Sequence, residues 1–120
     1  MPPAKELIKD ERFAAAVRLI GNTGANEFQI RFSPEDEKPI TWTALGRWGK
    51  KWECGAAMNP LLAVFRLCDE VIDGGMCTHC HRPTGFVPDL DAMPMDELIC
   101  WYQWDPSHKE FRRGCIGVAP

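Results

Sequence analysis

The sequence predicts an α+β fold in which two helices pack on a small antiparallel sheet, followed by a C-terminal knuckle and hairpin that carry cysteines. Three observations support this prediction: two segments of helical periodicity, an alternating segment between them, and a C-x2-C pair followed by an aromatic segment flanked by further cysteines. The chain has 120 residues and 45% hydrophobic residues, which is enough for a core of its own. We expect a single domain over residues 1–120, with a helix–hairpin–helix part at 1–75 and a cysteine-rich part at 76–120.

Two amphipathic segments predict the helices. Residues 4–20 repeat apolar side chains at helical spacing, with Asp10 as a candidate cap and Gly21 as a stop. The second helix lies between Asn59-Pro60, an N-cap followed by proline at the first helical position, and the glycine pair at 74–75. Its apolar stripe contains Leu61, Leu62, Phe65, Cys68, Val71 and Ile72.

An antiparallel hairpin is predicted between the helices. Residues 28–32 and 40–44 alternate apolar and polar side chains, and the segment between them is rich in turn-forming residues. Residues 48–54 either extend this sheet, after a break at Gly46 and Gly49, or form a loop, because the two lysines in the segment do not favour a strand.

The last third of the chain predicts a loop followed by a second hairpin. Residues 86–98 are acidic and broken by prolines, which is typical of a loop, whereas 98–104 is rich in the aromatic residues that favour strands. After a turn, residues 110–115 can return antiparallel. This arrangement would bring Cys100 and Cys115 together at the open end of the hairpin.

Cys77 and Cys80 form the most informative motif, because two thiolates at this spacing on a tight turn can face one ion. The pair is typical of half of a tetrahedral zinc site. A redox dithiol of the thioredoxin type needs its first cysteine at a helix N-terminus, but Pro83 and Gly85 follow too closely for a helix to begin there. The first residues of the chain show no apolar run after a basic start, so we expect a reducing compartment in which metal binding is favoured over disulfides.

Cys100 and Cys115 are the best candidates for the other half of the site, and they complete the pattern C-x2-C-x19-C-x14-C. They could instead be ordinary small strand residues. His79, His81 and His108 compete for the same ligand positions. His81 directly follows Cys80 and is expected to point away from the ion, towards solvent or towards a ligand, and His108 is expected on the surface of a turn. The two remaining cysteines, Cys54 and Cys68, are expected in the core.

The sequence lacks the signatures of common catalytic sites. It contains no H-E-x-x-H, no H-x-E before the C-x2-C pair, no G-x-S-x-G, no phosphate loop and no G-x-G-x-x-G. Four cysteine ligands would also leave no open coordination position for a water molecule, which catalytic zinc requires. We therefore expect one structural Zn²⁺, a zinc-braced C-terminal part and no enzymatic activity.

Charge and aromatic content bear on the partner. The net charge of −3 and the pI near 5.6 argue against binding nucleic acid through bulk positive charge. The chain nevertheless contains a mixture of aromatic and basic side chains, which could stack on bases and contact phosphates. The alternative interpretation is a solvated loop whose tryptophans anchor it to the core. We expect a protein partner, with nucleic acid as the alternative and no membrane contact. The candidate binding residues are Arg47, Trp48, Lys50, Lys51, Trp52, Arg112 and Arg113.

A resemblance to a known family rests on the segments 28–32, 63–67, 73–85, 100–106 and 111–115. On these segments the chain resembles small proteins of unassigned function encoded by phages of mycobacteria and related actinobacteria, and the resemblance as a whole extends over most of residues 13–115.

The resemblance implies a ligand set of four cysteines that excludes His81. It further implies a phage setting, and hence the host bacterial cytoplasm. From the closed metal site and the lack of catalytic signatures, we expect a non-catalytic, zinc-containing accessory protein whose partner is a host or phage protein. The resemblance brings no known activity. The implied ligands are Cys77, Cys80, Cys100 and Cys115.

Overall fold

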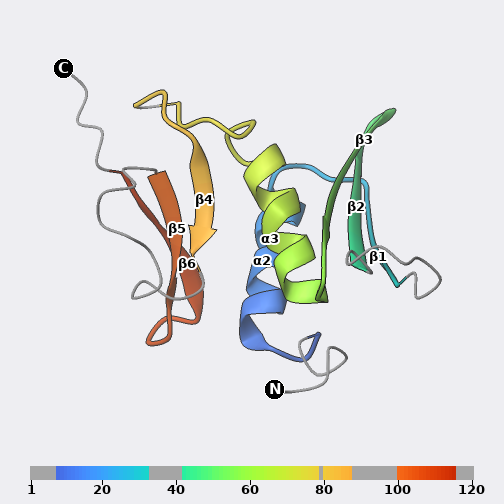
Figure 1. Ribbon diagram of the computed structural model, residues 1–120, viewed down its shortest axis with the longest axis horizontal. Helices are drawn as coiled ribbons and strands as arrows, with labels where there is room; N and C mark the ends of the chain where they lie inside the picture. The colour runs from blue at the N-terminus through green and yellow to red at the C-terminus, as the bar shows by residue number, and fades with distance from the viewer. Residues whose placement is uncertain (1–7, 33–41, 79, 88–99, 116–120) are drawn as a thin grey trace.

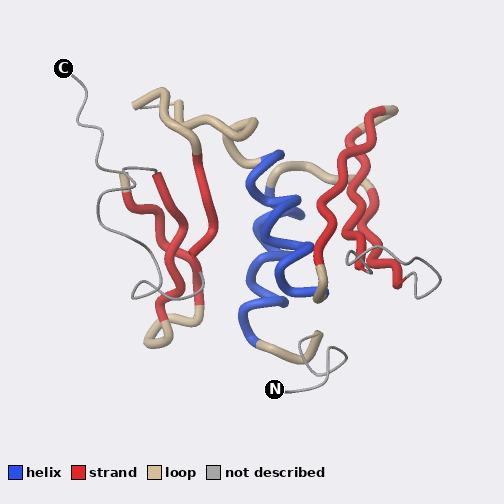
Figure 2. The backbone as a smooth tube through the Cα atoms, in the orientation of Figure 1, coloured by secondary structure: helices blue, strands red, loops and turns tan. Residues whose placement is uncertain are grey.

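In the computed structural model, two helices lie between two three-stranded sheets (Figure 1), and the described residues are 8–32, 42–78, 80–87 and 100–115. The middle layer contains α2 (Glu11–Asn22) and α3 (Pro60–Val71). The N-terminal sheet contains β1 (Glu27–Phe32), β2 (Trp42–Trp48) and β3 (Lys51–Ala57). The C-terminal sheet contains β4 (Thr84–Val87), β5 (Cys100–Asp105) and β6 (Glu110–Gly114). Figure 2 shows the helices between the two groups of strands, and the predicted α+β class is confirmed.

Helix α2 begins later than the sequence suggested. Asp10 is its N-cap, and the carboxylate accepts a hydrogen bond of 2.8 Å from the backbone N–H of Arg12. Residues 8–10 form a turn before the helix, and the predicted start at residue 4 lies outside the described residues. Phe13 and Ile20 are buried, as the helical spacing predicted.

The N-terminal sheet is antiparallel throughout. Ile30 pairs with Ala44, which confirms the predicted hairpin. The two alternatives for residues 48–54 are decided in favour of a strand, because β3 pairs with β2 over its whole length and places Cys54 opposite Leu45. One face of this sheet meets the helices. At Gly55, an added Cβ would lie 2.5 Å from the carbonyl oxygen of Ala63, so that only glycine allows α3 to pack this closely.

Helix α3 has the predicted start but a wider buried surface than predicted. The side chain of Asn59 accepts a hydrogen bond of 2.8 Å from the backbone N–H of Leu62. Ala63, Val64 and Leu67, which lie outside the predicted stripe, are fully buried. The reason is that α3 contacts strands of both sheets, so a single amphipathic stripe understates its burial.

The C-terminal sheet contains a strand that sequence analysis missed. Residues 86–87 belong to β4 rather than to the predicted loop, and residues 88–99 of that loop lie outside the described part. Strand β4 runs parallel to β5, with Phe86 opposite Tyr102, whereas β5 and β6 form the predicted antiparallel hairpin. The rings of Phe86 and Tyr102 stack at 4.6 Å, and Phe65 of α3 packs edge-on against Phe111 at 5.4 Å.

The aromatic residues of β5 divide between its two faces, as the geometry of a strand requires. Tyr102 is buried and Trp104 packs against the core. Trp101 faces the other way and lies against Gly114, where an added Cβ would be 2.5 Å from the indole Nε1.

Asp69 of α3 makes the stability of the protein depend on pH. Burial raises its pKa to about 7, despite a hydrogen bond from the backbone N–H of Phe86, and its Oδ1 has no partner among the described residues. Because the pKa is raised on folding, the protonated side chain favours the folded state below about pH 4, and this contribution is lost as the pH rises to about 7. We expect Asp69→Asn to become progressively more stable relative to the wild type across this window.

Urea unfolding of both proteins at several pH values measures this difference. A stability difference that does not change with pH would contradict the role of Asp69.

Candidate metal centre

The chain turns sharply between α3 and the C-x2-C pair. Asp73, Gly74 and Gly75 all have positive φ values, of 140°, 58° and 79°. The backbone N–H of Cys77 then donates to the carbonyl of Arg82 at 2.8 Å, which closes a tight knuckle. The exit of α3 therefore places the first pair of cysteines at the edge of the C-terminal sheet.

The second pair comes from the β5–β6 hairpin. Cys100 is the first residue of β5, and Cys115 directly follows β6. Because these strands are antiparallel, both cysteines lie at the open end of the hairpin, as predicted. The backbone N–H of Cys100 donates to the carbonyl of Pro83 at 3.1 Å, which joins the strand to the knuckle.

The four sulfur atoms lie within 4.8 Å of one another. The Sγ–Sγ distances are 2.8 Å for Cys80 and Cys100, 3.3 Å for Cys100 and Cys115, and 3.8 Å for Cys77 and Cys115. Sulfurs at about 2.3 Å from a tetrahedral zinc ion would be about 3.8 Å apart, whereas a disulfide needs about 2.05 Å. The cysteines are not disulfide-bonded. The distance between Cys77 and Cys115 equals the spacing around zinc, whereas the other two distances are shorter, so the four sulfurs could hold a metal ion after a small outward shift.

The surroundings of the sulfurs favour a bound cation. Cys77 and Cys100 are each only 1% exposed. Burial raises the pKa of the Cys100 thiol far above its usual value, and hydrogen bonds with the neighbouring thiols raise it further. Several thiolates cannot share this space without a counter-charge, and a divalent cation supplies one. The donor set suits an ion that prefers sulfur in tetrahedral geometry.

The histidines take no part in the described cluster. His108 lies in the turn at the other end of the β5–β6 hairpin, where its Nδ1 is 2.8 Å from Oδ2 of Asp105. His81 is exposed, and its backbone N–H donates to the carbonyl of Cys77 at 3.0 Å. His79 lies outside the described residues. Among the described residues, the group able to hold a metal contains four cysteines and no histidine.

The other two cysteines differ from each other. Cys68 is fully buried on α3, as predicted, and burial raises its pKa. Its Sγ lies 3.7 Å from the carbonyl oxygen of Ala16. The expectation that Cys54 belongs to the core is wrong, since Cys54 is exposed. The alternation along β3 places it with Trp52 on the sheet face that points away from the helices.

The structure divides the predicted cluster of aromatic and basic residues. Arg47 and Trp52 are paired in register on the outer face of the N-terminal sheet. Trp48 points to the other face, and its Nε1 donates a hydrogen bond to Oγ1 of Thr23 at 2.9 Å. Trp48 is thereby anchored to the rest of the fold, as the alternative to nucleic-acid binding expected. Lys50 lies in the turn between β2 and β3.

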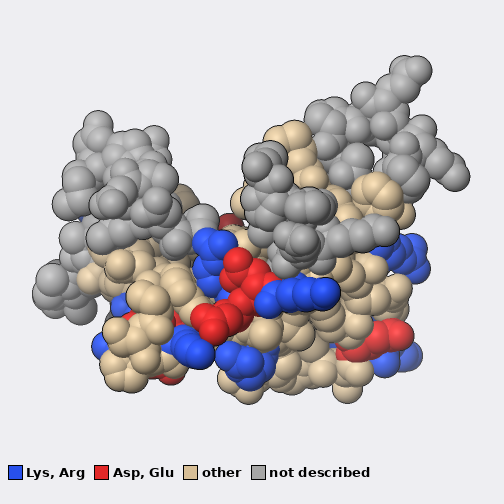
Figure 3. Space-filling model, turned by 90° about the horizontal axis from the view of Figure 1, so that it is seen from below, with Lys and Arg blue, Asp and Glu red and all other residues tan. Residues whose placement is uncertain are grey.

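Most of these cations have carboxylate partners. Arg47 is 3.3 Å from Glu27, and Lys51 is 3.2 Å from Glu53. Arg112 is 2.8 Å from Asp105. Figure 3 shows the same pattern on the face it presents, where Lys and Arg side chains lie next to Asp and Glu side chains.

Arg113 makes contacts that the sequence did not indicate. It belongs to the predicted basic cluster, but its guanidinium donates to Sγ of Cys77 at 2.8 Å and pairs with Asp73 at 2.9 Å. The alternation of side chains along β6 could have separated Arg113 from Arg112. Arg113 lies opposite Tyr102 on the helix-facing side of the sheet, whereas Arg112 points to the other side.

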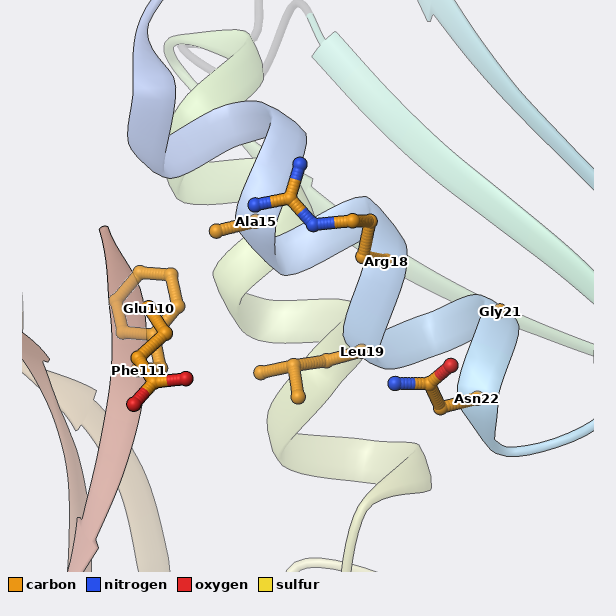
Figure 4. A pocket seen from close by; sticks show the side chains of 7 residues that line it. All are labelled: Ala15, Arg18, Leu19, Gly21, Asn22, Glu110 and Phe111. Atoms are coloured by element: carbon orange, nitrogen blue, oxygen red, sulfur yellow. The ribbon is translucent and has the colours of Figure 1, made fainter. Parts of the chain in front are cut away.

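A pocket of about 440 Å³ lies between α2 and β6 (Figure 4). Its polar groups are Arg18, Asn22 and Glu110, and it has neither a cysteine nor a histidine. Nothing in it forms a nucleophile with an adjacent base. The lining residues are Ala15, Arg18, Leu19, Gly21, Asn22, Glu110 and Phe111.

Neither α2 nor α3, with 12 residues each, combines the length and the apolar character that a membrane-spanning helix needs. Comparison of the chain with protein-family models, with curated proteins and with solved structures finds no match.

Proposed function

We propose that the chain is a non-catalytic protein in which one structural Zn²⁺ stabilises a fold that binds a protein partner. The observation that carries this proposal is the meeting of four sulfurs from three separate parts of the chain: the knuckle at 77–80, the start of β5 and the end of β6. A tetrahedral ion at this point would tie the exit of α3 to the hairpin. Four thiolates fill its coordination shell, which leaves no position for a substrate or a reactive water.

Two features support a protein partner over nucleic acid. Binding of phosphates needs available cations, whereas Arg47, Lys51 and Arg112 lie in ion pairs with carboxylates. Large apolar side chains are exposed instead, with Trp52 at 46% and Met58 at 66%. In line with the resemblance to actinobacteriophage proteins, we propose a bacterial host factor or a phage protein as the partner, met in the host cytoplasm.

Affinity capture tests the partner class. Zinc-loaded protein on a resin should retain a host or phage protein from nuclease-treated lysate of an infected actinobacterium, and the retained protein should bind the purified chain directly. An unrelated four-cysteine zinc protein serves as the control bait. Enrichment of no protein over this bait would contradict the proposal.

Single-stranded oligonucleotides test the alternative in the same preparation. We expect no binding that falls steeply with added salt, because such a slope reports the release of counterions from phosphates. A steep slope, together with loss of binding in Trp52→Ala, would favour the nucleic-acid alternative.

A further inference from the structure

We propose that Arg113 is a positioning residue of the metal centre: it holds the Cys77 thiolate by a charge-assisted hydrogen bond and offsets the negative charge of the site, while Asp73 holds Arg113 in place. This inference rests on the proposed zinc site and goes beyond it, because it assigns the strength of metal binding to two residues that are not ligands.

The contacts of Arg113 leave its guanidinium little freedom. Nη2 lies 2.8 Å from Sγ of Cys77 and 2.9 Å from Oδ2 of Asp73, and Nη1 lies 3.3 Å from Oδ1 of Asp73. The guanidinium carbon lies 5.7 Å from the centre of the Tyr102 ring. The phenol of Tyr102 in turn donates to Oδ2 of Asp73 at 3.4 Å. Arg113 is therefore held by its carboxylate partner, by an aromatic ring and by a cysteine of the site.

Charge explains why a cation is useful at this position. Four thiolates around a divalent cation carry a net charge of −2, and Cys77 and Cys100 are almost completely buried. A hydrogen bond from a charged donor stabilises a thiolate more than a neutral donor does. The planar guanidinium can contact Asp73 and Cys77 at the same time, whereas the ammonium of a lysine is a compact charge without this fork.

The backbone of Asp73 is a second, independent observation. Its φ is 140°, in a region that side chains other than glycine rarely adopt, and two glycines follow it. Its side chain is only 11% exposed. A strained position of this kind favours glycine, and the presence of aspartate is explained by the ion pair with Arg113. Asp73 also directly follows Ile72, the C-cap of α3, so the pair connects this helix to the metal centre.

Metal affinity measured by competition with a chromophoric chelator tests the proposal. We expect Arg113→Met to raise the zinc dissociation constant by about 10-fold to 100-fold, as is typical when a hydrogen-bond partner of a metal ligand is lost. Arg113→Lys should recover part of this loss, and Asp73→Asn should weaken binding in the same direction. Arg112→Met is the matched control, since Arg112 lies on the opposite face of β6 and pairs with Asp105, and its affinity should equal that of the wild type.

Cobalt substitution gives a readout that a general loss of stability would not produce. Removal of the hydrogen bond to Cys77 makes its thiolate more electron-rich, so the sulfur-to-cobalt charge-transfer band of Arg113→Met should move to lower energy, and that of Arg112→Met should not.

Three outcomes overturn the proposal. The first is equal zinc affinity and an equal cobalt spectrum in the wild type and Arg113→Met. The second applies if Arg113→Met does not fold, and it is wild-type zinc affinity in both Arg113→Lys and Asp73→Asn. A wild-type chain that binds no metal would instead refute the proposed zinc site, and the role of Arg113 with it.

Discussion

Replacement of Cys100 with serine should abolish stoichiometric metal binding and unfold the C-terminal sheet. Sγ of Cys100 is 2.8 Å from that of Cys80 and 3.3 Å from that of Cys115, so it lies centrally in the cluster. Structural zinc contributes on the order of 10 kcal/mol of apparent folding free energy, which is comparable to the whole stability of a small domain. Metal analysis and hydrogen exchange measure the two effects, and exchange should increase most in β4, β5 and β6.

Cys68→Ala is the matched control for this experiment. Cys68 is a buried cysteine outside the cluster, and its replacement should leave the metal content unchanged and cost about 1 kcal/mol of stability. Full metal content in Cys100→Ser, or metal loss in Cys68→Ala, would show that the ligand set is wrong.

Gly55→Ala should destabilise the protein by about 3 kcal/mol or more without removing a metal ligand. The added Cβ would meet the carbonyl oxygen of Ala63 at 2.5 Å and the backbone nitrogen of Leu67 more closely still. Backbone atoms cannot rotate away as the end of a side chain can, so α3 would have to move off β3. Urea unfolding of the zinc-loaded protein measures the effect.

Gly21→Ala is the control for this second prediction, because an added Cβ in α2 meets no atom within 4 Å. A glycine-to-alanine change within a helix should stabilise by about 0.5–1 kcal/mol. If the two variants unfolded at the same urea concentration, the close approach of α3 to β3 would not be a determinant of stability.

Local signals in the sequence were sufficient for the helices and for the grouping of the cysteines. The N-cap Asn59 defined the start of α3, and the alternation of residues 28–32 defined β1. The cysteine cluster was predictable from the spacing of Cys77 and Cys80 and from the turn of the last hairpin, which places Cys100 near Cys115. Each of these features depends on residues that are close in sequence or joined by one turn.

The features that escaped prediction depend on distant parts of the chain. Strand β4 has four residues, too few for a periodic pattern, and its partner is the parallel strand β5. Leu67 is buried because its side of α3 packs on the N-terminal sheet, where Gly55 of β3 lies against the backbone of Ala63 and Leu67. Arg113 acquires its role from Asp73, which is 40 residues away. Such contacts arise only when the layers assemble.

X-ray absorption spectroscopy at the zinc edge of the purified chain tests the metal centre most directly. The proposed site predicts one zinc ion per chain with a first shell of four sulfurs at about 2.3 Å. Matched measurements on Arg113→Lys should show the same shell, because Arg113 is not a ligand. A shell that contains nitrogen or oxygen, or a folded chain that holds no zinc, would contradict it.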